Sequence, residues 1–157
     1  MTQSVTGTRA ALFAVCQTLY TGQNTLVSWG PPGEFQPDLI VAVMGARVPI
    51  TRPTMGTGRS REQSCEITVV FSQYVHGGPE ASQPAETAAW AAADQLEAYF
   101  RTKPNEELGG ACRDAWVSAK DIADPEIAWE PTGDGTSSAA VGRVATVTVT
   151  VTAAVRI

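Results

Sequence analysis

The chain has 157 residues, which is enough for one ordinary domain with its own core. Its hydrophobic content of 43% is typical of soluble globular proteins, and no apolar run approaches the roughly 20 residues of a membrane span. Sixteen acidic and eleven basic residues give a net charge of −5, which disfavours a protein that wraps DNA tightly.

The first predicted element is a helix through RAALFAVCQTLY, residues 9–20. Thr6 or Thr8 can cap its start, and Gly22 is a natural stop. No basic segment followed by an apolar core precedes this helix, so we expect no secretory signal. Its apolar stripe comprises Leu12, Val15, Cys16 and Leu19.

Two strands are expected next. TLVSWG is a short strand, and the Gly-Pro-Pro-Gly turn at residues 30–33 ends it because proline cannot continue a ladder. PDLIVAVMGARV contains a continuous apolar run over residues 39–44. The valine and isoleucine content of that run favours a buried strand.

A long loop, called the arm below, is predicted at residues 49–64, PITRPTMGTGRSREQS. Loops of more than about a dozen residues without regular structure usually have a function. From residue 62 onward, acids outnumber bases fourteen to six, whereas residues 41–61 contain no acid. Two interpretations of this arginine-rich loop stay open: a solvated surface, or contact with a neighbouring acidic surface or a phosphate backbone. The arginines of residues 41–61 are Arg47, Arg52, Arg59 and Arg61.

Downstream of the arm, CEITVVFSQYVHGG alternates as a strand with both faces partly covered. AETAAWAAADQLEAYFRT, residues 85–102, is the clearest helix, and its alanines allow close packing against a sheet. ACRDAWVSAKDIADPEIAWEP predicts two strands around an acidic turn at residues 121–125. The polar loop TGDGTSS then leads into the last strand. The apolar stripe of the helix predicted at residues 85–102 comprises Ala89, Ala92, Leu96, Tyr99 and Phe100.

The last predicted strand is RVATVTVTVTAAVRI, residues 143–157, in which valine and threonine alternate. Successive side chains of a strand point to opposite faces, so one face is apolar and belongs on a core. The other face carries threonines and suits water or a protein neighbour. The apolar face comprises Ala145, Val147, Val149, Val151, Ala153, Val155 and Ile157, and the other face comprises Thr146, Thr148, Thr150 and Thr152.

Together these elements predict an α/β (α+β) fold in one domain over residues 1–157. Short turns between successive strands predict a mixed, mainly antiparallel sheet with two helices packed on one face. The other face is then open to solvent or covered by something outside this chain.

Residues that could carry chemistry are scattered. His76 is the only histidine and follows a strand, and Cys16, Cys65 and Cys112 lack metal-ligand spacing and are expected to be reduced thiols of a cytosolic setting. GTGRS, residues 56–60, lacks the lysine and spacing of a Walker A loop and precedes a strand. We therefore expect neither an enzyme nor a bound cofactor or metal. The tryptophans Trp29, Trp90, Trp116 and Trp129 lie on different elements, which favours core packing or an interface.

The order of elements, the arm sequence GTGRSRE, the strand CEITVVFSQYVHGG and the alanine-rich helix resemble the tail terminator proteins of long-tailed (siphovirus) phages, notably those of actinobacteria. The resemblance covers most of the chain. The part around residues 133–138 is longer than expected and leaves the C-terminal strand order open. The resemblance places Arg59, Ser60, Arg61 and Glu62 in the family's arm. With Arg52, they are the candidate subunit-interface or lumen residues.

The resemblance implies a structural virion protein that is made in the bacterial cytoplasm. It would form a hexameric ring at the head-proximal end of the tail tube, stop tube polymerisation and join the tail to the head connector or stopper protein. Genomic DNA would pass through the lumen without sequence-specific binding. The alternatives are another neck or tail component, such as a stopper or tube subunit, or a small ligand-binding or phosphoester-processing protein that uses GTGRS.

Overall fold

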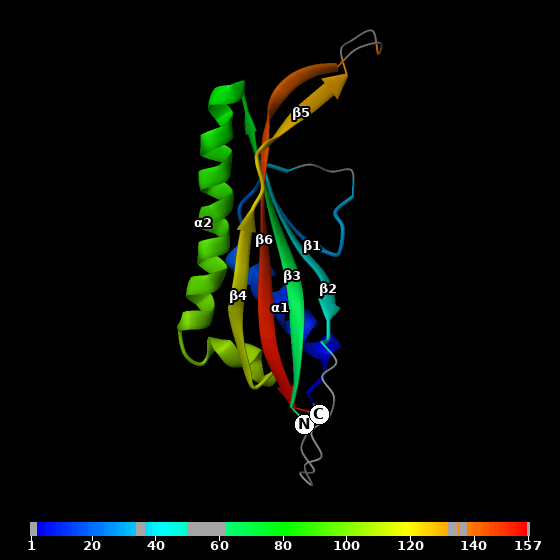
Figure 1. Cartoon of the computed structure of the whole chain (residues 1–157), viewed down its shortest axis with the longest axis vertical. Helices are drawn as coiled ribbons and strands as arrows, with labels where there is room; N and C mark the ends of the chain where they lie inside the picture. The colour runs from blue at the N-terminus through cyan, green and yellow to red at the C-terminus, as the bar shows by residue number, and fades with distance from the viewer. Residues whose placement is uncertain (1–2, 34–36, 50–61, 132–134, 136–137, 157) are drawn as a thin grey trace.

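The computed structural model describes residues 3–33, 37–49, 62–131, 135 and 138–156. Two α-helices, two short 3-10 helices and six strands follow one another along the chain (Figure 1). In order they are α1 (Val5–Leu19), β1 (Thr25–Trp29), β2 (Leu39–Arg47), β3 (Glu62–His76), η1 (Pro79–Ala81), α2 (Ser82–Arg101), η2 (Asn105–Gly110), β4 (Asp114–Ile122), β5 (Glu126–Pro131) and β6 (Ser138–Arg156).

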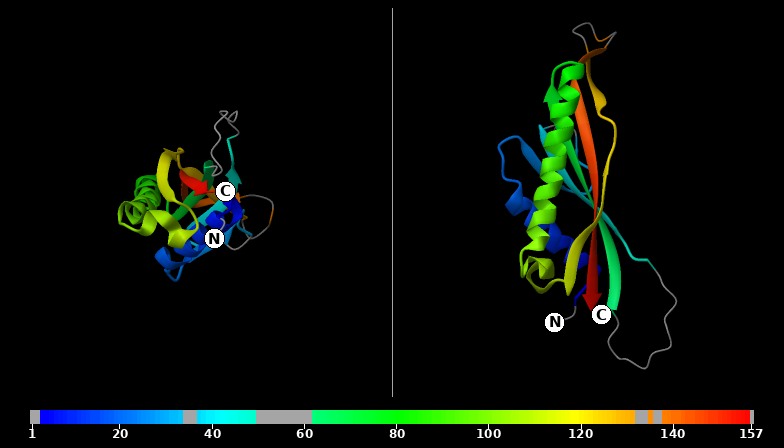
Figure 2. Two further views of the ribbon diagram at one scale, coloured as in Figure 1. Left: turned by 90° about the horizontal axis from the view of Figure 1, so that it is seen from below. Right: turned by 60° about the vertical axis from the view of Figure 1, so that its left-hand side comes forward.

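One six-stranded sheet joins all the strands in the order β1-β2-β3-β6-β4, with β5 paired to the first part of β6. The β1–β2 pair is parallel and every other pair is antiparallel. Both helices lie on one face of the sheet (Figure 2). The prediction of a mixed, mainly antiparallel sheet with two helices on one face is confirmed, and the C-terminal strand order is now defined. The single domain over residues 1–157 stays a prediction.

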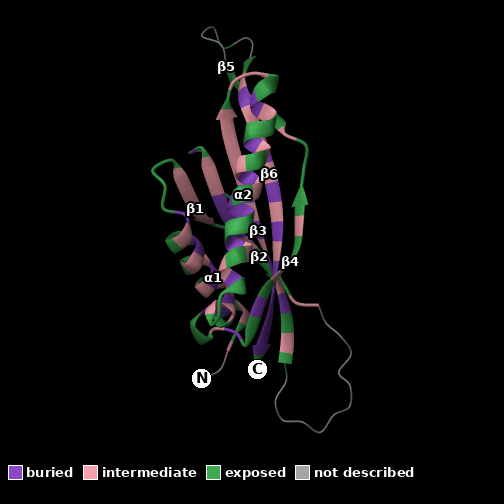
Figure 3. Cartoon of the chain, turned by 90° about the vertical axis from the view of Figure 1, so that its left-hand side faces the viewer, coloured by how far each residue is buried: buried purple, intermediate pink, exposed green. Residues whose placement is uncertain are grey.

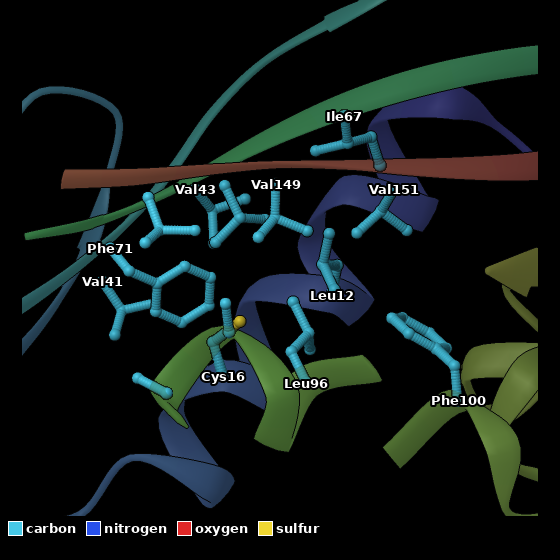
Figure 4. Packing of buried hydrophobic residues seen from close by; sticks show 14 of the residues in the cluster. Leu12, Cys16, Val41, Val43, Ile67, Phe71, Leu96, Phe100, Val149 and Val151 are labelled. Atoms are coloured by element: carbon cyan, nitrogen blue, oxygen red, sulfur yellow. The ribbon is translucent and has the colours of Figure 1, made fainter. Parts of the chain in front are cut away.

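The core lies between the helices and the two longest strands. β3 has 15 residues and β6 has 19, and they pair along their whole common length, so Ile67 faces Val151 and Val69 faces Val149. These side chains are fully buried between the sheet and the helices, as are Leu12 of α1 and Phe71 of β3 (Figure 4). Alternation in the sequence therefore places the valine face of β6 on the core, as predicted.

Helix α1 begins earlier than predicted. Its N-cap is Ser4, whose hydroxyl accepts a hydrogen bond from the backbone N–H of Gly7 at 3.0 Å, so the prediction of Thr6 or Thr8 was wrong. Thr8 lies within the helix and is fully buried. Its hydroxyl oxygen lies within 3.0 Å of two carbonyl oxygens, those of Ser4 and Ala111. Thr8 therefore ties α1 to the segment after η2.

Helix α2 packs through alanines against β3 and β6. Ala85, Ala89 and Ala93 are fully buried, which lets the helix axis approach the sheet closely. Its contact with β4 includes polar groups: the ammonium group of Lys120 on β4 donates to Asp94 at 2.7 Å and also to Glu97. The two carboxylates raise the pKa of Lys120. These contacts connect α2 to β4. Figure 3 shows buried and exposed positions interspersed along α2, with exposed positions on the side turned away from the sheet.

Two strands also begin earlier than predicted. The arm was expected to run through residue 64, but β3 begins at Glu62, because residues 62–64 pair with residues 154–156 of β6. The last strand was expected to begin at residue 143, but β6 begins at Ser138, because its first residues pair with β5. None of the described helices is long and apolar enough to cross a membrane.

Candidate functional site

The sheet face opposite the helices carries side chains that neither α1 nor α2 covers. We call it the uncovered face. Its residues alternate with the buried core residues of the same strands, and most of them are half-buried by their neighbours alone. The centre of the face is a ladder of β-branched and hydroxyl side chains, and larger or charged side chains surround it. These are Leu26 on β1, Ile40 on β2, and Glu66 and Tyr74 on β3. The central members of the face are Thr68, Val70 and Ser72 on β3 and Thr146, Thr148 and Thr150 on β6.

The β4 edge of this face carries a large aromatic side chain. Trp116 pairs with Thr152 across β4 and β6, and 44% of the tryptophan remains exposed. Next to it, the Thr152 hydroxyl donates to the Ser118 hydroxyl at 2.7 Å. The hydroxyl groups of Thr152 and Ser118 are therefore hydrogen-bonded to each other, whereas the indole of Trp116 remains partly exposed.

β5 and residues 138–144 of β6 form a hairpin, called the hairpin below (Figure 1). Its base, residues 142–144, also pairs with β3, whereas residues 129–131 and 138–140 extend beyond β3 as two strands. Gly142 lies at the base of the hairpin, where the ring of Tyr74 crosses the strand. A Cβ atom at Gly142 would lie 2.5 Å from the Tyr74 ring and 2.6 Å from the Val75 carbonyl oxygen. Glycine is therefore required where the hairpin leaves the sheet.

The hairpin carries the most exposed large apolar side chain among the described residues, together with a second exposed one. Trp129 is 59% exposed and Ile127 is 43% exposed. They are two residues apart on β5 and so share one face of the ribbon, while Glu126 and Glu130 share the other. Ile127 lies in the base that pairs with β3, whereas Trp129 lies in the two-stranded part beyond it. A two-stranded ribbon is marginally stable in water, so an exposed tryptophan on it indicates a contact surface.

The predicted arm site comprises five residues, of which the structure describes one, Glu62. Arg52, Arg59, Ser60 and Arg61 lie outside the described residues. Glu62 is described at the start of β3, where its carboxylate accepts from the Arg113 guanidinium at 2.7 Å. Both side chains are at least half exposed, so this ion pair contributes little stability.

The described residues do not bring together the chemical groups that the sequence offered. Cys65 is buried in the core, while His76 lies eleven residues further along β3, roughly 36 Å of extended strand away. No cluster of three or more histidine, cysteine or acidic side chains that could hold a metal ion occurs among the described residues. GTGRS lies outside them.

The three thiols are buried and protonated. Burial raises the pKa of Cys16 and Cys112 to about 12 from an ordinary value of 9.0, and it also raises the pKa of Cys65. The thiolate is the reactive form of cysteine, so the folded protein should not react with thiol reagents near neutral pH.

Alkaline pH should therefore destabilise the fold. Between about pH 9 and about pH 12 the unfolded chain loses the thiol protons of Cys16 and Cys112, which the folded chain keeps. The free energy of unfolding should therefore fall by at most about 1.4 kcal/mol per pH unit for each of these two thiols. Below about pH 9 the thiols should cause no change. Urea unfolding between about pH 8 and pH 11 measures this, and Cys16→Ala should give a shallower fall. A flat profile above about pH 9 would contradict the burial of these thiols.

Three of the four tryptophans lie on the surface, so core packing does not account for them. Trp29, Trp116 and Trp129 are each more than 40% exposed, whereas Trp90 lies half-buried under Lys120. The second strand predicted in ACRDAWVSAKDIADPEIAWEP is confirmed as β5, but its pairing with the first residues of β6 was not predicted. A signal was present, because isoleucine and tryptophan alternate with glutamates in EIAWE.

No protein-family model matches the chain, and no curated protein matches its sequence significantly.

Proposed function

We propose that this chain is a structural subunit that assembles with copies of itself into a ring at the head-proximal end of a siphovirus tail tube. The ring ends tube polymerisation and joins the tail to the connector or stopper protein of the head, and phage DNA passes through its lumen. On this proposal the protein works in the neck of the virion, needs no cofactor and catalyses no reaction.

The uncovered face is the observation that carries the proposal. A sheet with helices on one side only leaves half of its surface available to another protein. Here the centre of that half is a ladder of threonine, serine and valine, with the exposed Trp116 at its β4 edge. Small β-branched side chains on a pleated surface suit tight protein packing. The resemblance of the sequence to tail terminators supplies the ring and its position on the tail.

Among tail components, the terminator agrees best with the architecture. A tube subunit is expected to be more uniformly β, whereas α2 spans 20 residues and contributes six buried side chains. The arm, with Arg52, Arg59 and Arg61, is proposed to meet the next subunit or line the lumen.

Binding to the end of a tail tube tests the position of the ring. Tubes assembled from the cognate tube protein are mixed with the purified chain and viewed by electron microscopy, and tube length is followed with time. We expect density at one end only and an arrest of elongation there. Incorporation along the tube would indicate a tube subunit instead. Absence from both ends, with unchanged elongation, would contradict the proposal.

A further inference from the structure

The hairpin and a hollow at the other end of the molecule have complementary properties. The hollow has a volume of about 420 Å³ and lies between the end of α2 and the start of β4. Trp116 borders it, which makes the hollow continuous with the uncovered face. Its lining comprises Phe100, Arg101, Lys103, Glu106, Arg113, Asp114, Ala115 and Trp116.

Charge distinguishes the two surfaces. Residues 121–131, which lead into and form β5, contain four acids and no lysine or arginine. All four acids, Asp121, Asp124, Glu126 and Glu130, are exposed. The hollow has three cationic side chains against two acidic ones. Lys103 forms no ion pair with any described residue, whereas Arg101 and Arg113 each pair with one carboxylate.

Apolar contacts are also complementary. The hairpin presents Trp129 and Ile127 on one face, and the hollow presents the exposed indole of Trp116 beside Phe100. Aromatic side chains that dock beside other aromatic groups within a charged rim are typical of interface centres.

The hairpin of one chain cannot reach the hollow of the same chain. Trp129 pairs with Ala140 and Trp116 pairs with Thr152. Twelve residues of β6, roughly 40 Å of extended strand, separate the two positions. The two surfaces lie at opposite ends of the molecule in both side views (Figure 1, Figure 2). A contact between them therefore joins two molecules.

We infer that the hairpin of one chain docks into the hollow of a second copy of this chain, with Trp129 packing beside Trp116 and the hairpin acids facing Lys103. The inference rests on the proposed function, because it names the partner of the surface beside the uncovered face. One patch binds a different patch on the next copy, so the contact is head-to-tail and closes into a ring when the rotation permits.

Two variants that each lose one half of the contact test this inference. The hairpin variant carries Ile127→Ser and Trp129→Ser, and the hollow variant carries Lys103→Glu and Trp116→Ser. Each should associate with itself about 100-fold more weakly than the wild type, because central aromatic contacts dominate interface energies. Light scattering measures their masses, and circular dichroism checks that each variant folds. Trp29→Ser is the matched control, because Trp29 is an exposed aromatic residue on β1, outside both surfaces, and its loss should leave assembly unchanged.

Mixing the two variants gives the deciding result. The hollow variant keeps an intact hairpin and the hairpin variant keeps an intact hollow, so the mixture should form a 1:1 complex of two 16.5 kDa chains, about 33 kDa, and stop there. If the wild type assembles and either variant still assembles like it, or the mixture forms no 1:1 complex, the hairpin contact is wrong and the ring proposal stands. If the wild type never self-associates, both are wrong.

Discussion

Thr150→Arg should convert the assembled protein into monomers without unfolding it. Thr150 lies at the centre of the uncovered face, between Thr68 on β3 and Ala119 on β4. In a monomer the long arginine side chain can reach water, so the free energy of unfolding should change by no more than about 0.5 kcal/mol. In the assembly the guanidinium would be buried without a partner, which costs about 3–5 kcal/mol at each contact.

Light scattering with the Thr150→Arg variant measures the loss of assembly, and urea unfolding confirms the fold. Ala91→Arg is the matched control, because Ala91 is exposed on α2 and adds the same charge on the helix side of the molecule. The control should keep the wild-type mass. Unchanged assembly of the Thr150→Arg variant would show that the uncovered face is not a subunit contact.

Gly142→Ala should produce the largest loss of stability among single-methyl changes in the sheet. The added Cβ would lie 2.6 Å from the Val75 carbonyl oxygen, which belongs to the backbone and cannot rotate away as a side chain can. Overpacking of this kind costs about 1–3 kcal/mol, and the backbone clash places this site at the upper end. For a chain of this length the melting temperature should fall by roughly 5–10 °C.

Gly45→Ala provides the control for that substitution. Gly45 also lies within a strand, β2, but an added Cβ would meet no atom within 4 Å. Alanine has less backbone freedom to lose, so this variant should equal or exceed the wild type in stability by up to about 1 kcal/mol. Calorimetry of both variants measures the difference. Equal melting temperatures would contradict the close approach of β3 and β6 at the hairpin base.

Local patterns were sufficient to predict the elements that form the core. Val147, Val149 and Val151 alternate with threonines, and this period places them on one face whatever the neighbouring strands are. Alanines at Ala89 and Ala93 likewise indicated a helix pressed against a sheet. Such patterns involve residues that are close together in the sequence, so they can be recognised in a single sequence.

Features that depend on distant residues were not predicted. Ser4, Thr6 and Thr8 are equally suitable caps by residue type, and Thr8 is excluded because its hydroxyl lies beside Ala111, 103 residues away. The early start of β6 depends on pairing with β5, and the hairpin depends on the space that Gly142 leaves for Tyr74. For the arm, four of the five predicted site residues lie outside the described part of the chain, so their role stays a prediction.

The mass of the purified wild-type protein in solution, measured by light scattering over a range of concentration and salt, tests the central claim that this chain assembles with itself. We expect six copies of the 16.5 kDa chain, about 99 kDa, at high concentration. Added salt should weaken the assembly, because it screens contacts between the acidic hairpin and the cationic hollow. A mass of one chain, 16.5 kDa, at every concentration and salt would contradict the claim.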